Sequence, residues 1–450
     1  MFIHRLTVAL VAAVTAATAG AAANTTGPPL LTYAVAPMWV GSGVLGLCAT
    51  DLQGMTFRVT NPHYNAIPSW SPDGRSLAFS GPANPPGQDH FADLYVTDAQ
   101  ARRAHNQTSR GGRGSVRSVF GWSPDGREVG ANWSGWSDAV FIAKADRTDV
   151  RVLASTSYGA YVTGDSWSPD GKHILLSRSS FETNQVPAIS VIDPDGKNER
   201  TLIGSAGSGA WSPDGQRFAY VSYAPGRPTG LGVADSDGAN AHLLLQDANV
   251  ATKPSWSPDG SQLAYIASSD GVHGSLGVVR ADGSDARLLA GGALPGSPLG
   301  GSGTPQWSPD GSLIAFTRGS YQAYRVAVIK PDGSGEREVA AGFDPAWRVP
   351  APVPPHRRPC IVHGTSRADV IHGTRMGDVI LAGRGADRVY GGGGPDVIVG
   401  GLGPDHLFGG AGGDVFGARD RTRDYIVGGN GSDTAYVDPV DVRSQLETVH

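Results

Sequence analysis

Short apolar runs, bounded by turn-forming residues, follow one another along residues 31–348. Apolar residues dominate the runs at 76–79, 172–176 and 312–316, and a copy of the pentapeptide WSPDG stands just before each of them. Within the pentapeptide, Ser, Pro, Asp and Gly stand in the order that the four positions of a type I turn prefer. The pattern therefore predicts a β-hairpin at every copy.

The pentapeptide recurs at a nearly constant spacing. A second hairpin with an Asp-Gly turn follows the first, as at 189–196 and 326–333. Two hairpins make one four-stranded blade, and the spacing of 44 to 52 residues is close to the period of a β-propeller. We expect the Trp ring of each copy to pack between neighbouring blades. The six copies begin at Trp70, Trp122, Trp167, Trp211, Trp256 and Trp307.

Both ends of this region hold half-blades that lack a partner. A second hairpin at 47–60 stands before the first WSPDG copy, and a lone first strand at 343–347 follows the sixth. If 31–35 is also a strand, these segments assemble a seventh blade from both termini and leave no exposed sheet edge. The sequence thus predicts an all-β fold with a seven-bladed β-propeller, and six blades is the alternative.

Residues 360–450 carry a different repeat, with a period of nine. Its frame is GGxGxDxUx, where U is an apolar residue. Aspartates stand at Asp369, Asp378, Asp387, Asp396, Asp405 and Asp414 and, after a one-residue insertion, at Asp424 and Asp433. The U positions are Ile371, Ile380, Val389, Ile398, Leu407, Phe416, Ile426 and Ala435. We expect this apolar row to face inward.

The residue types of this frame suit calcium. Glycine admits positive φ, so paired glycines can turn their carbonyls toward a common point, and Asp adds a hard, charged oxygen. Calcium accepts six to eight such oxygens in a flexible geometry. Asp424 is left out because residues 419–427 have lost the glycines. The candidate metal-site residues are Asp369, Asp378, Asp387, Asp396, Asp405, Asp414, Asp433, Gly383, Gly385, Gly392, Gly394, Gly401, Gly403, Gly410 and Gly412.

Both repeats resemble known families. The six WSPDG copies resemble the propeller of TolB and related PD40, WD40-like repeats over residues 31–348, and the nonapeptides resemble RTX, or haemolysin-type, calcium-binding repeats over 364–436. The second resemblance implies a parallel β-roll with Ca²⁺ between stacked turns. Two nonapeptides then make one coil, so aspartates eighteen residues apart share an edge. It also implies that metal binding and folding of the tail are one event.

The first residues predict export. His4 and Arg5 precede an apolar run, and small residues end at a cleavage site after Ala23. No later run approaches the ~20 apolar residues of a membrane-spanning helix. We expect a secreted, extracellular monomer with no transmembrane segment. The predicted segments are a signal peptide (1–23), a propeller (24–348), a Pro-rich linker (349–359) and the β-roll with a C-terminal cap (360–450).

Charge and cysteines add little. The net charge of −5 over 450 residues gives no electrostatic reason to expect nucleic acid as a partner. The two cysteines, Cys48 and Cys360, both lie near the place where the ring must close, and an exported protein can oxidise them. A Cys48–Cys360 disulfide and two unrelated thiols both remain open.

An enzymatic function is the less favoured interpretation. The sequence holds neither a GxSxG nucleophile elbow nor an HExxH zinc motif. Propellers of oligogalacturonate lyases, which place histidines and a metal on the central axis, are also similar. Here the histidines, His63, His90, His105, His173, His242 and His273, share no position in the repeat. We therefore expect a binding or scaffold protein whose propeller contacts an extracellular protein or a glycan, with a propeller polysaccharide lyase or hydrolase as the alternative.

Overall fold

The molecule is described here from a computed structural model. The described residues are 30–35, 46–50, 56–58, 66–82, 92–98, 104–108, 114–135, 137–146, 149–157, 159–180, 185–223, 229–246, 248–268, 274–293, 303–319, 324–348, 361–363, 368–373 and 377–449. These residues form strands β1 to β39 and no helix, which confirms the all-β prediction. The predicted signal peptide and Pro-rich linker lie outside the described residues.

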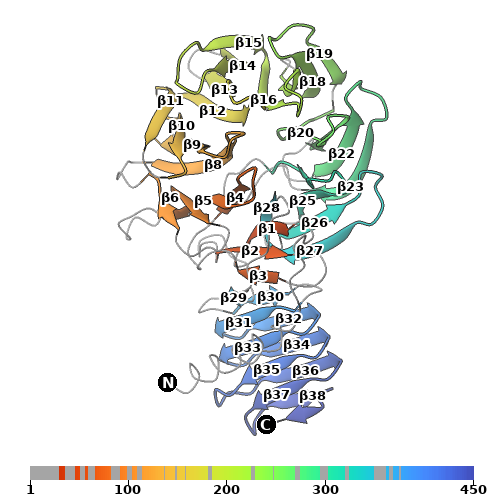
Figure 1. Cartoon of the computed structure of the whole chain (residues 1–450). Helices are drawn as coiled ribbons and strands as arrows, with labels where there is room; N and C mark the ends of the chain where they lie inside the picture. Colours follow the sequence, from red (N-terminus) through yellow and green to blue (C-terminus); the bar gives the residue numbers. More distant parts are fainter. Residues whose placement is uncertain are drawn as a thin grey trace.

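The first sheet is assembled from both ends of the propeller, in the order β28-β1-β2-β3. Leu31 of β1 lies opposite Trp347 of β28 in an antiparallel register, and the two strands lie side by side in Figure 1. The predicted pairing of the two termini is therefore confirmed. The strands are β1 (Leu30–Val35), β2 (Gly46–Thr50), β3 (Thr56–Arg58) and β28 (Phe343–Arg348).

The strands between β3 and β28 build units of the same four-stranded kind. Four units are separate sheets, and two are joined through the pair Ala293 and Arg318 into one eight-stranded sheet. Within the described residues, β1 to β28 thus form seven four-stranded units. The first three further units contain β4 (Ala66–Trp70), β5 (Ser76–Pro82), β6 (Ala92–Asp98), β7 (His105–Asn106), β8 (Gly114–Trp122), β9 (Glu128–Gly135), β10 (Ala139–Lys144), β11 (Val150–Ser155), β12 (Ala160–Trp167), β13 (Ile174–Ser180), β14 (Gln185–Ile192) and β15 (Arg200–Gly204). The last three contain β16 (Ala206–Trp211), β17 (Arg217–Ser222), β18 (Gly230–Asp235), β19 (His242–Leu245), β20 (Ser255–Trp256), β21 (Gln262–Ala267), β22 (Gly274–Arg280), β23 (Arg287–Ala293), β24 (Gln306–Trp307), β25 (Ile314–Arg318), β26 (Arg325–Ile329) and β27 (Arg337–Ala341).

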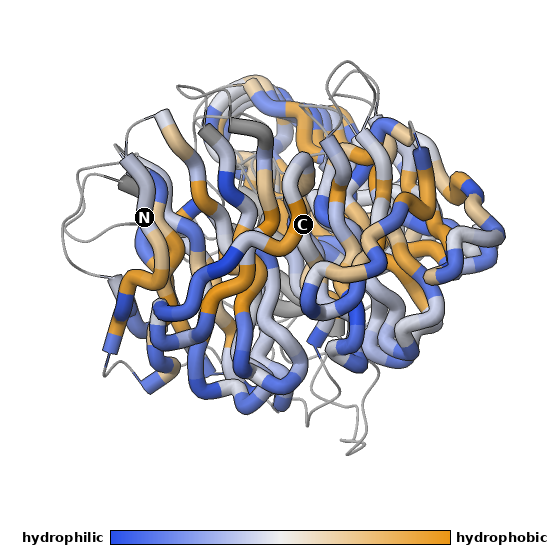
Figure 2. The backbone as a smooth tube through the Cα atoms, turned by 90° about the horizontal axis from the view of Figure 1, so that it is seen from above, coloured by the Kyte–Doolittle hydropathy of each residue, from blue (hydrophilic) through white to orange (hydrophobic). Residues whose placement is uncertain are grey.

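The Trp of the WSPDG repeat ties one blade to the preceding blade. The indole N–H of Trp122 donates to the carbonyl of Ser69 at 2.9 Å, and Trp307 donates in the same way to Ser255 at 3.0 Å. The Trp122 ring is buried in a cluster with Leu94 of the preceding blade. The predicted packing of Trp between blades is therefore confirmed for these copies. Apolar stretches run along the strands, and hydrophilic residues gather at the turns (Figure 2).

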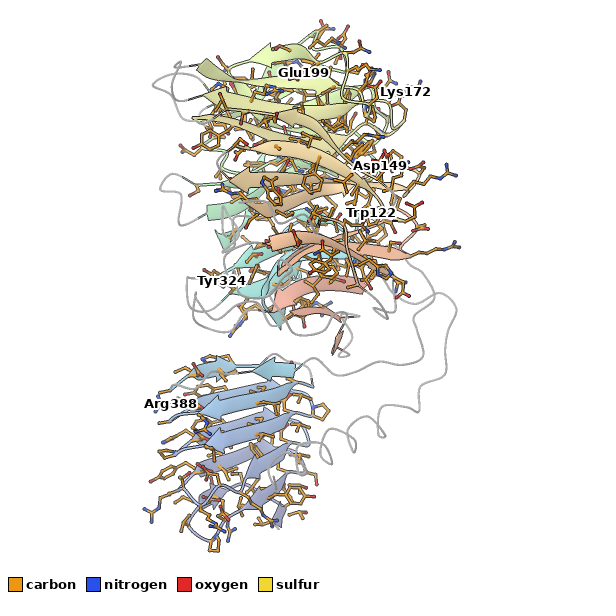
Figure 3. The ribbon with its side chains drawn as sticks, turned by 90° about the vertical axis from the view of Figure 1, so that its left-hand side faces the viewer. Trp122, Asp149, Lys172, Glu199, Tyr324 and Arg388 are labelled. Carbon is orange, nitrogen blue, oxygen red and sulfur yellow. The ribbon has the colours of Figure 1, made fainter. Side chains whose placement is uncertain are left out.

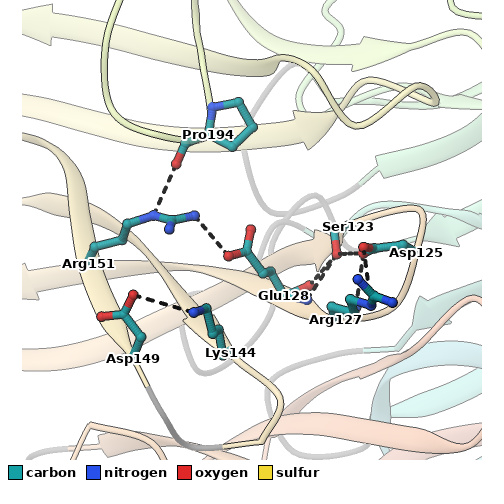
Figure 4. A network of polar contacts seen from close by, with 8 residues as sticks. All are labelled: Ser123, Asp125, Arg127, Glu128, Lys144, Asp149, Arg151 and Pro194. Atoms are coloured by element: carbon teal, nitrogen blue, oxygen red, sulfur yellow. Dashed lines mark hydrogen bonds and ion pairs between the residues drawn. The ribbon is translucent and has the colours of Figure 1, made fainter.

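The WSPDG turns close as the sequence predicts. The carbonyl of Ser123 accepts the N–H of Gly126 at 2.8 Å, which is the hydrogen bond of a four-residue turn. The Ser123 hydroxyl also donates to the carboxylate of Asp125 at 2.6 Å (Figure 4). In the same view Arg151 donates to the carbonyl of Pro194 in the next blade at 3.2 Å. Side-chain contacts thus support both the turns and the blade interfaces.

The tail is a stack of parallel strands that alternate between two sheets, seen as successive rungs in Figures 1 and 3. Val379 pairs with Val397 and Arg388 with His406, eighteen residues further on, and across the one-residue insertion His406 pairs with Tyr425, nineteen residues further on. The six-stranded sheet contains β29 (Ile361–His363), β31 (Val379–Arg384), β33 (Val397–Leu402), β35 (Val415–Ala418), β37 (Thr434–Val437) and β39 (Thr448–Val449). The five-stranded sheet contains β30 (Val370–His372), β32 (Arg388–Gly393), β34 (His406–Ala411), β36 (Tyr425–Asn430) and β38 (Val442–Ser444).

The interior of this roll is the predicted apolar row. All eight U positions are buried and form one cluster between the two sheets. Phe416 is its largest fully buried side chain. The C-terminal residues continue both sheets through β38 and β39, so the predicted cap is itself part of the roll.

Candidate metal centre

The aspartates of the roll form two rows, one along each edge. The N–H of Asp387 donates to Oδ1 of Asp405 at 2.8 Å, and the N–H of Asp396 donates to Oδ1 of Asp414 at 2.9 Å. The predicted sharing of an edge by aspartates eighteen residues apart is therefore confirmed. The Asp387 edge contains Asp369, Asp387, Asp405, Asp424 and Asp441, and the Asp396 edge contains Asp378, Asp396, Asp414 and Asp433.

The second oxygen of most of these carboxylates has no hydrogen-bond partner. These Oδ2 atoms are buried within residues that are at most 1 % exposed. A buried carboxylate oxygen without a donor is strongly disfavoured unless a cation or a proton compensates it. The unpaired atoms are Oδ2 of Asp387, Asp396, Asp405, Asp414 and Asp433.

The predicted glycines have the backbone that their role requires. Their φ angles lie between 77° and 138°, a region that side chains other than glycine rarely adopt. A Cβ atom at Gly401 would lie 1.9 Å from the carbonyl oxygen of Gly383, and one at Gly410 would lie 2.1 Å from that of Gly392. Each turn thus places carbonyl oxygens directly against the next turn of the same edge. These glycines are Gly383, Gly385, Gly392, Gly394, Gly401, Gly403, Gly410 and Gly412.

Burial raises the pKa of several carboxyl groups along the two edges. Desolvation, together with the neighbouring Asp378 and Asp414 carboxylates, raises the pKa of Asp396 to about 9. Desolvation likewise raises the pKa of Asp405 to about 7 and that of Asp387 to about 6. The buried carboxyls of one edge thus disfavour ionisation, because desolvation and the neighbouring carboxylates both oppose it. A divalent cation between them would favour the ionised carboxylates.

The carboxylates alone do not make a complete site. Among the described residues, no group of three or more His, Cys, Asp or Glu side chains converges as a metal cage. Successive rungs of one edge each supply one aspartate. The remaining oxygens of a calcium site would therefore be the turn carbonyls, which suits an ion that accepts backbone oxygen. The residues present fit calcium on these terms.

The described histidines of the propeller lie at two places in the repeat, so the prediction that they share no position is wrong for His105 and His242. His105 and His242 lie in β7 and β19, the last strands of their units. His173 follows a WSPDG turn, where its Nδ1 lies 3.0 Å from Asp193. His63, His90 and His273 lie outside the described residues. Cys360 and the side chain of Cys48 also lie outside them, so the predicted disulfide stays a prediction.

A polar cluster of the propeller is missing from the sequence predictions. Asp165 of β12 is 6 % exposed, and its Oδ2 accepts the hydroxyl of Ser177 and, at 2.8 Å, the N–H of Gly209 in the next unit. Lys253 donates to the backbone carbonyl of Asp165 at 2.8 Å from two units away. Desolvation raises the pKa of Asp165 to about 6. Its only sequence signal is a carboxylate two residues before a WSPDG Trp.

A cavity lies among the first strands of the propeller units. Its volume is about 480 Å³, and Trp70, Phe120, Lys253, Trp307 and Trp347 are among the residues that line it. Aromatic walls with one cationic group suit an apolar ligand or an inserted side chain. The cavity, which Asp344 also lines, thus offers a small binding place.

Two regions of the chain match protein-family models. Residues 178–327 match the TolB beta propeller domain, PD40. Residues 363–398, 390–418 and 421–438 match the RTX calcium-binding nonapeptide repeat. The chain therefore carries a TolB-type β-propeller followed by RTX calcium-binding repeats, which confirms both resemblances. RTX repeats are typical of secreted proteins, and the described residues contain no helix that is long and apolar enough to cross a membrane.

Individual relatives cover only part of the chain. An uncharacterized protein of Agrobacterium fabrum is 29% identical over 168 residues, which are 35% of this chain and 54% of that protein. The Tol-Pal system protein TolB of Gluconobacter oxydans is 51% identical over 41 residues, 9% of each chain. The chain thus spans about half the length of the first relative and about a tenth of the second.

Solved structures of propellers are similar to this chain. TolB from Acinetobacter baumannii has a TM-score of 0.47 at 19% identity, covering 61% of this chain and 66% of that one. An oligogalacturonate lyase in complex with manganese has a TM-score of 0.45 at 16% identity, covering 71% and 86% respectively.

Proposed function

We propose that this chain is a secreted calcium-binding protein that acts as a binding or scaffold module. Its propeller, seven blades in this proposal, offers a loop-lined face to an extracellular protein or a glycan, and calcium orders its tail. The observation that carries the proposal is the row of buried Asp Oδ2 atoms without donors along both edges of the roll. Calcium is the common extracellular cation that takes such oxygens.

The proposed calcium sites lie between successive turns of one edge. Asp387, Asp396, Asp405, Asp414 and Asp433 would each supply one carboxylate oxygen, and the stacked glycine turns would supply carbonyls. When bound, the ion supplies positive charge that the buried carboxylates otherwise lack. Without it, like charges repel and the glycine-rich turns regain their large backbone entropy. Binding and ordering of the roll are then coupled.

Export places the chain where calcium is plentiful. We propose cleavage of the signal peptide after Ala23, a propeller over 24–348, a linker over 349–359 and the roll over 360–450. Extracellular calcium modules bind with dissociation constants of about 10⁻⁴ to 10⁻³ M. Such affinities leave the tail unloaded inside a cell and loaded outside it.

Isothermal titration of the whole mature chain with calcium chloride tests the proposal. The wild-type chain should bind several ions, and Asp396→Ala should lose at least one of them. Asp149→Ala is the matched control, because Asp149 is a half-exposed residue of the propeller that pairs with Lys144. No binding at about 1 mM calcium would overturn the calcium assignment.

The ligand of the propeller needs a separate experiment. The whole exported chain, kept in calcium, should be applied to a glycan array and to envelope proteins in a pull-down. Retention of one glycan or protein class by the chain, and by a variant truncated after residue 348, assigns binding to the propeller. Retention only by the full chain would place the binding surface on the tail instead.

A further inference from the structure

One turn of the Asp387 edge differs from all the regular turns. In a regular turn, the glycine at the fourth position of the GGxGxDxUx frame donates its N–H to a carbonyl of the next turn on the same edge. That carbonyl belongs to the residue at the third position of the frame. Gly385 donates to Leu402 at 2.8 Å, and Gly412 donates to Asn430 at 2.7 Å. Residues 418–424, read ARDRTRD, have no glycine and one extra residue.

Side chains of this turn make the contacts that backbone makes elsewhere. The N–H of Gly403 donates to the carboxylate of Asp420 at 2.7 Å, in place of a carbonyl. The Thr422 hydroxyl lies 2.9 Å from the carbonyl oxygen of Gly403 and 2.6 and 2.7 Å from the two carboxylate oxygens of Asp420, so these three acceptors share its one proton. Asp420 is in turn held by the backbone N–H of Thr422 at 2.7 Å. Both polar groups of Gly403 therefore lie against one Asp–Thr pair.

The corresponding carbonyls of regular turns face glycine instead. The carbonyl oxygen of Gly385 would lie 1.8 Å from a Cβ atom at Gly403, and that of Gly394 would lie 2.2 Å from one at Gly412. These carbonyls thus point into the glycine backbone of the following turn, toward the place assigned to calcium. In the described turn 400–405, by contrast, the carbonyl of Gly403 lies against the hydroxyl group of Thr422.

Hydrogen bonds from backbone N–H groups to carboxylates continue into the last turn of the edge. Arg421 has a φ of 73°, which is unusual for a residue with a side chain, and its N–H donates to Asp438 at 2.6 Å. The N–H of Asp438 donates to Asp441 at 2.6 Å, and the N–H of Asp424 donates to Asp441 at 3.0 Å. The carboxylates of Asp420 and then Asp438 thus accept N–H groups, as third-position carbonyls do in the regular turns.

The arginines of the turn 418–424 and the positions of the unpaired carboxylate oxygens also distinguish this turn from the regular turns. Along the Asp387 edge, the buried oxygens without donors belong to Asp387 and Asp405, whereas Asp424 is not among such residues in the described part of the chain. The turn also carries three arginines, Arg419, Arg421 and Arg423, all exposed. A dication is disfavoured near three guanidinium groups.

We propose that Thr422 and Asp420 replace a calcium ion at the turn 418–424, so that calcium on the Asp387 edge ends at the level of Asp405. The inference rests on the proposed calcium binding by the regular turns. On the Asp396 edge the regular turns continue through Asp433, and calcium continues with them. The C-terminal turns of the Asp387 edge are consequently held together without metal.

Hydrogen exchange of the whole chain in chelator and in calcium tests this assignment. The amides of Gly403 and Arg421 should keep their protection in chelator, whereas the amides of Gly385 and Gly412 should lose at least tenfold of theirs. Thr422→Val removes the hydroxyl with little change of shape and should speed exchange at Gly403 in chelator. Thr434→Val in β37 is the control and should leave Gly403 unchanged.

A calcium count gives the second readout. Replacing residues 418–424 with the regular turn GGNGSD should raise the number of bound ions by one, measured by equilibrium dialysis with the metal alone. Protection of Gly403 that disappears in chelator together with that of Gly385 would overturn the proposal, even if the replacement chain fails to fold. Absence of calcium binding by the wild-type chain would instead overturn the proposed function.

Discussion

A single methyl group at Gly401 should disturb both the roll and its calcium. Gly401 has a φ of 108°, and a Cβ atom there would lie 1.9 Å from the carbonyl oxygen of Gly383. Backbone atoms on both sides prevent relief by a rotamer change, so the variant Gly401→Ala must shift the backbone. Holding a side-chain-bearing residue in such a region costs about 1–3 kcal/mol. The shift also moves the Gly383 carbonyl away from the place assigned to calcium.

Calcium binding makes a separate contribution to the free energy of unfolding. An ion that binds only the folded roll adds about 1.4 kcal/mol of unfolding free energy for each tenfold rise in free calcium. Losing one ion therefore lowers this slope by about 1.4 kcal/mol per tenfold. In addition, Gly401→Ala should lower the unfolding free energy by about 2 kcal/mol at every calcium concentration that folds the roll.

Calorimetric unfolding of the whole chain over a series of calcium concentrations measures both quantities. Gly417→Ala is the matched control, because its Cβ atom would meet Val399 at an ordinary 3.5 Å. The control should change the unfolding free energy by less than about 1 kcal/mol and keep the calcium slope. Equal losses in Gly401→Ala and Gly417→Ala would refute the reasoning from stacked turns.

Three further predictions concern other residues. Asp396→Ala should weaken cooperative calcium binding more than Asp424→Ala in a calcium titration, since Asp396 keeps an unpaired buried oxygen. A larger loss of binding in Asp424→Ala would contradict the assignment of calcium to Asp396. Burial raises the pKa of Asp165 from 3.8 to about 6. The protonated carboxyl therefore contributes its full stability to the propeller below about pH 4, and this contribution is lost as the pH rises through 6. The free energy of unfolding should fall by about 3 kcal/mol by pH 7 for this reason. Asp165→Asn should abolish that part of the pH dependence in denaturant unfolding, and an unchanged profile would exclude the carboxyl as its source. Cys48 and Cys360 should resist thiol labelling in the exported protein, and labelling of both would count against the disulfide.

Much of the fold can be predicted because it repeats. The WSPDG copies mark one hairpin per blade, and counting the leftover halves at 47–60 and 343–347 predicts the pairing of β1 with β28. In the roll, aspartates in a nine-residue phase predict which carboxylates share an edge. Repeats are readable in this way because each unit makes the same contacts with its neighbour.

The remaining features depend on contacts that the repeat does not encode. Asp165 becomes important only because Gly209 and Lys253, 44 and 88 residues away, lie against it. The loss of glycine at 418–424 is plain in the sequence, yet the sequence alone suggests only a weakened calcium site. That Thr422 and Asp420 take over the contacts of Gly403 follows from their hydrogen bonds in three dimensions.

Under the proposed function, calcium binding and the folding of the roll are one event. Segment-resolved hydrogen exchange of the whole mature chain, in about 1 mM calcium and then in chelator, tests it most directly. We predict that strands β31 and β32 are protected in calcium and exchange freely in chelator, while β9 and β10 of the propeller stay protected in both. Equal protection of β31 and β32 with and without calcium, together with no bound calcium, would contradict the calcium-coupled folding of the roll.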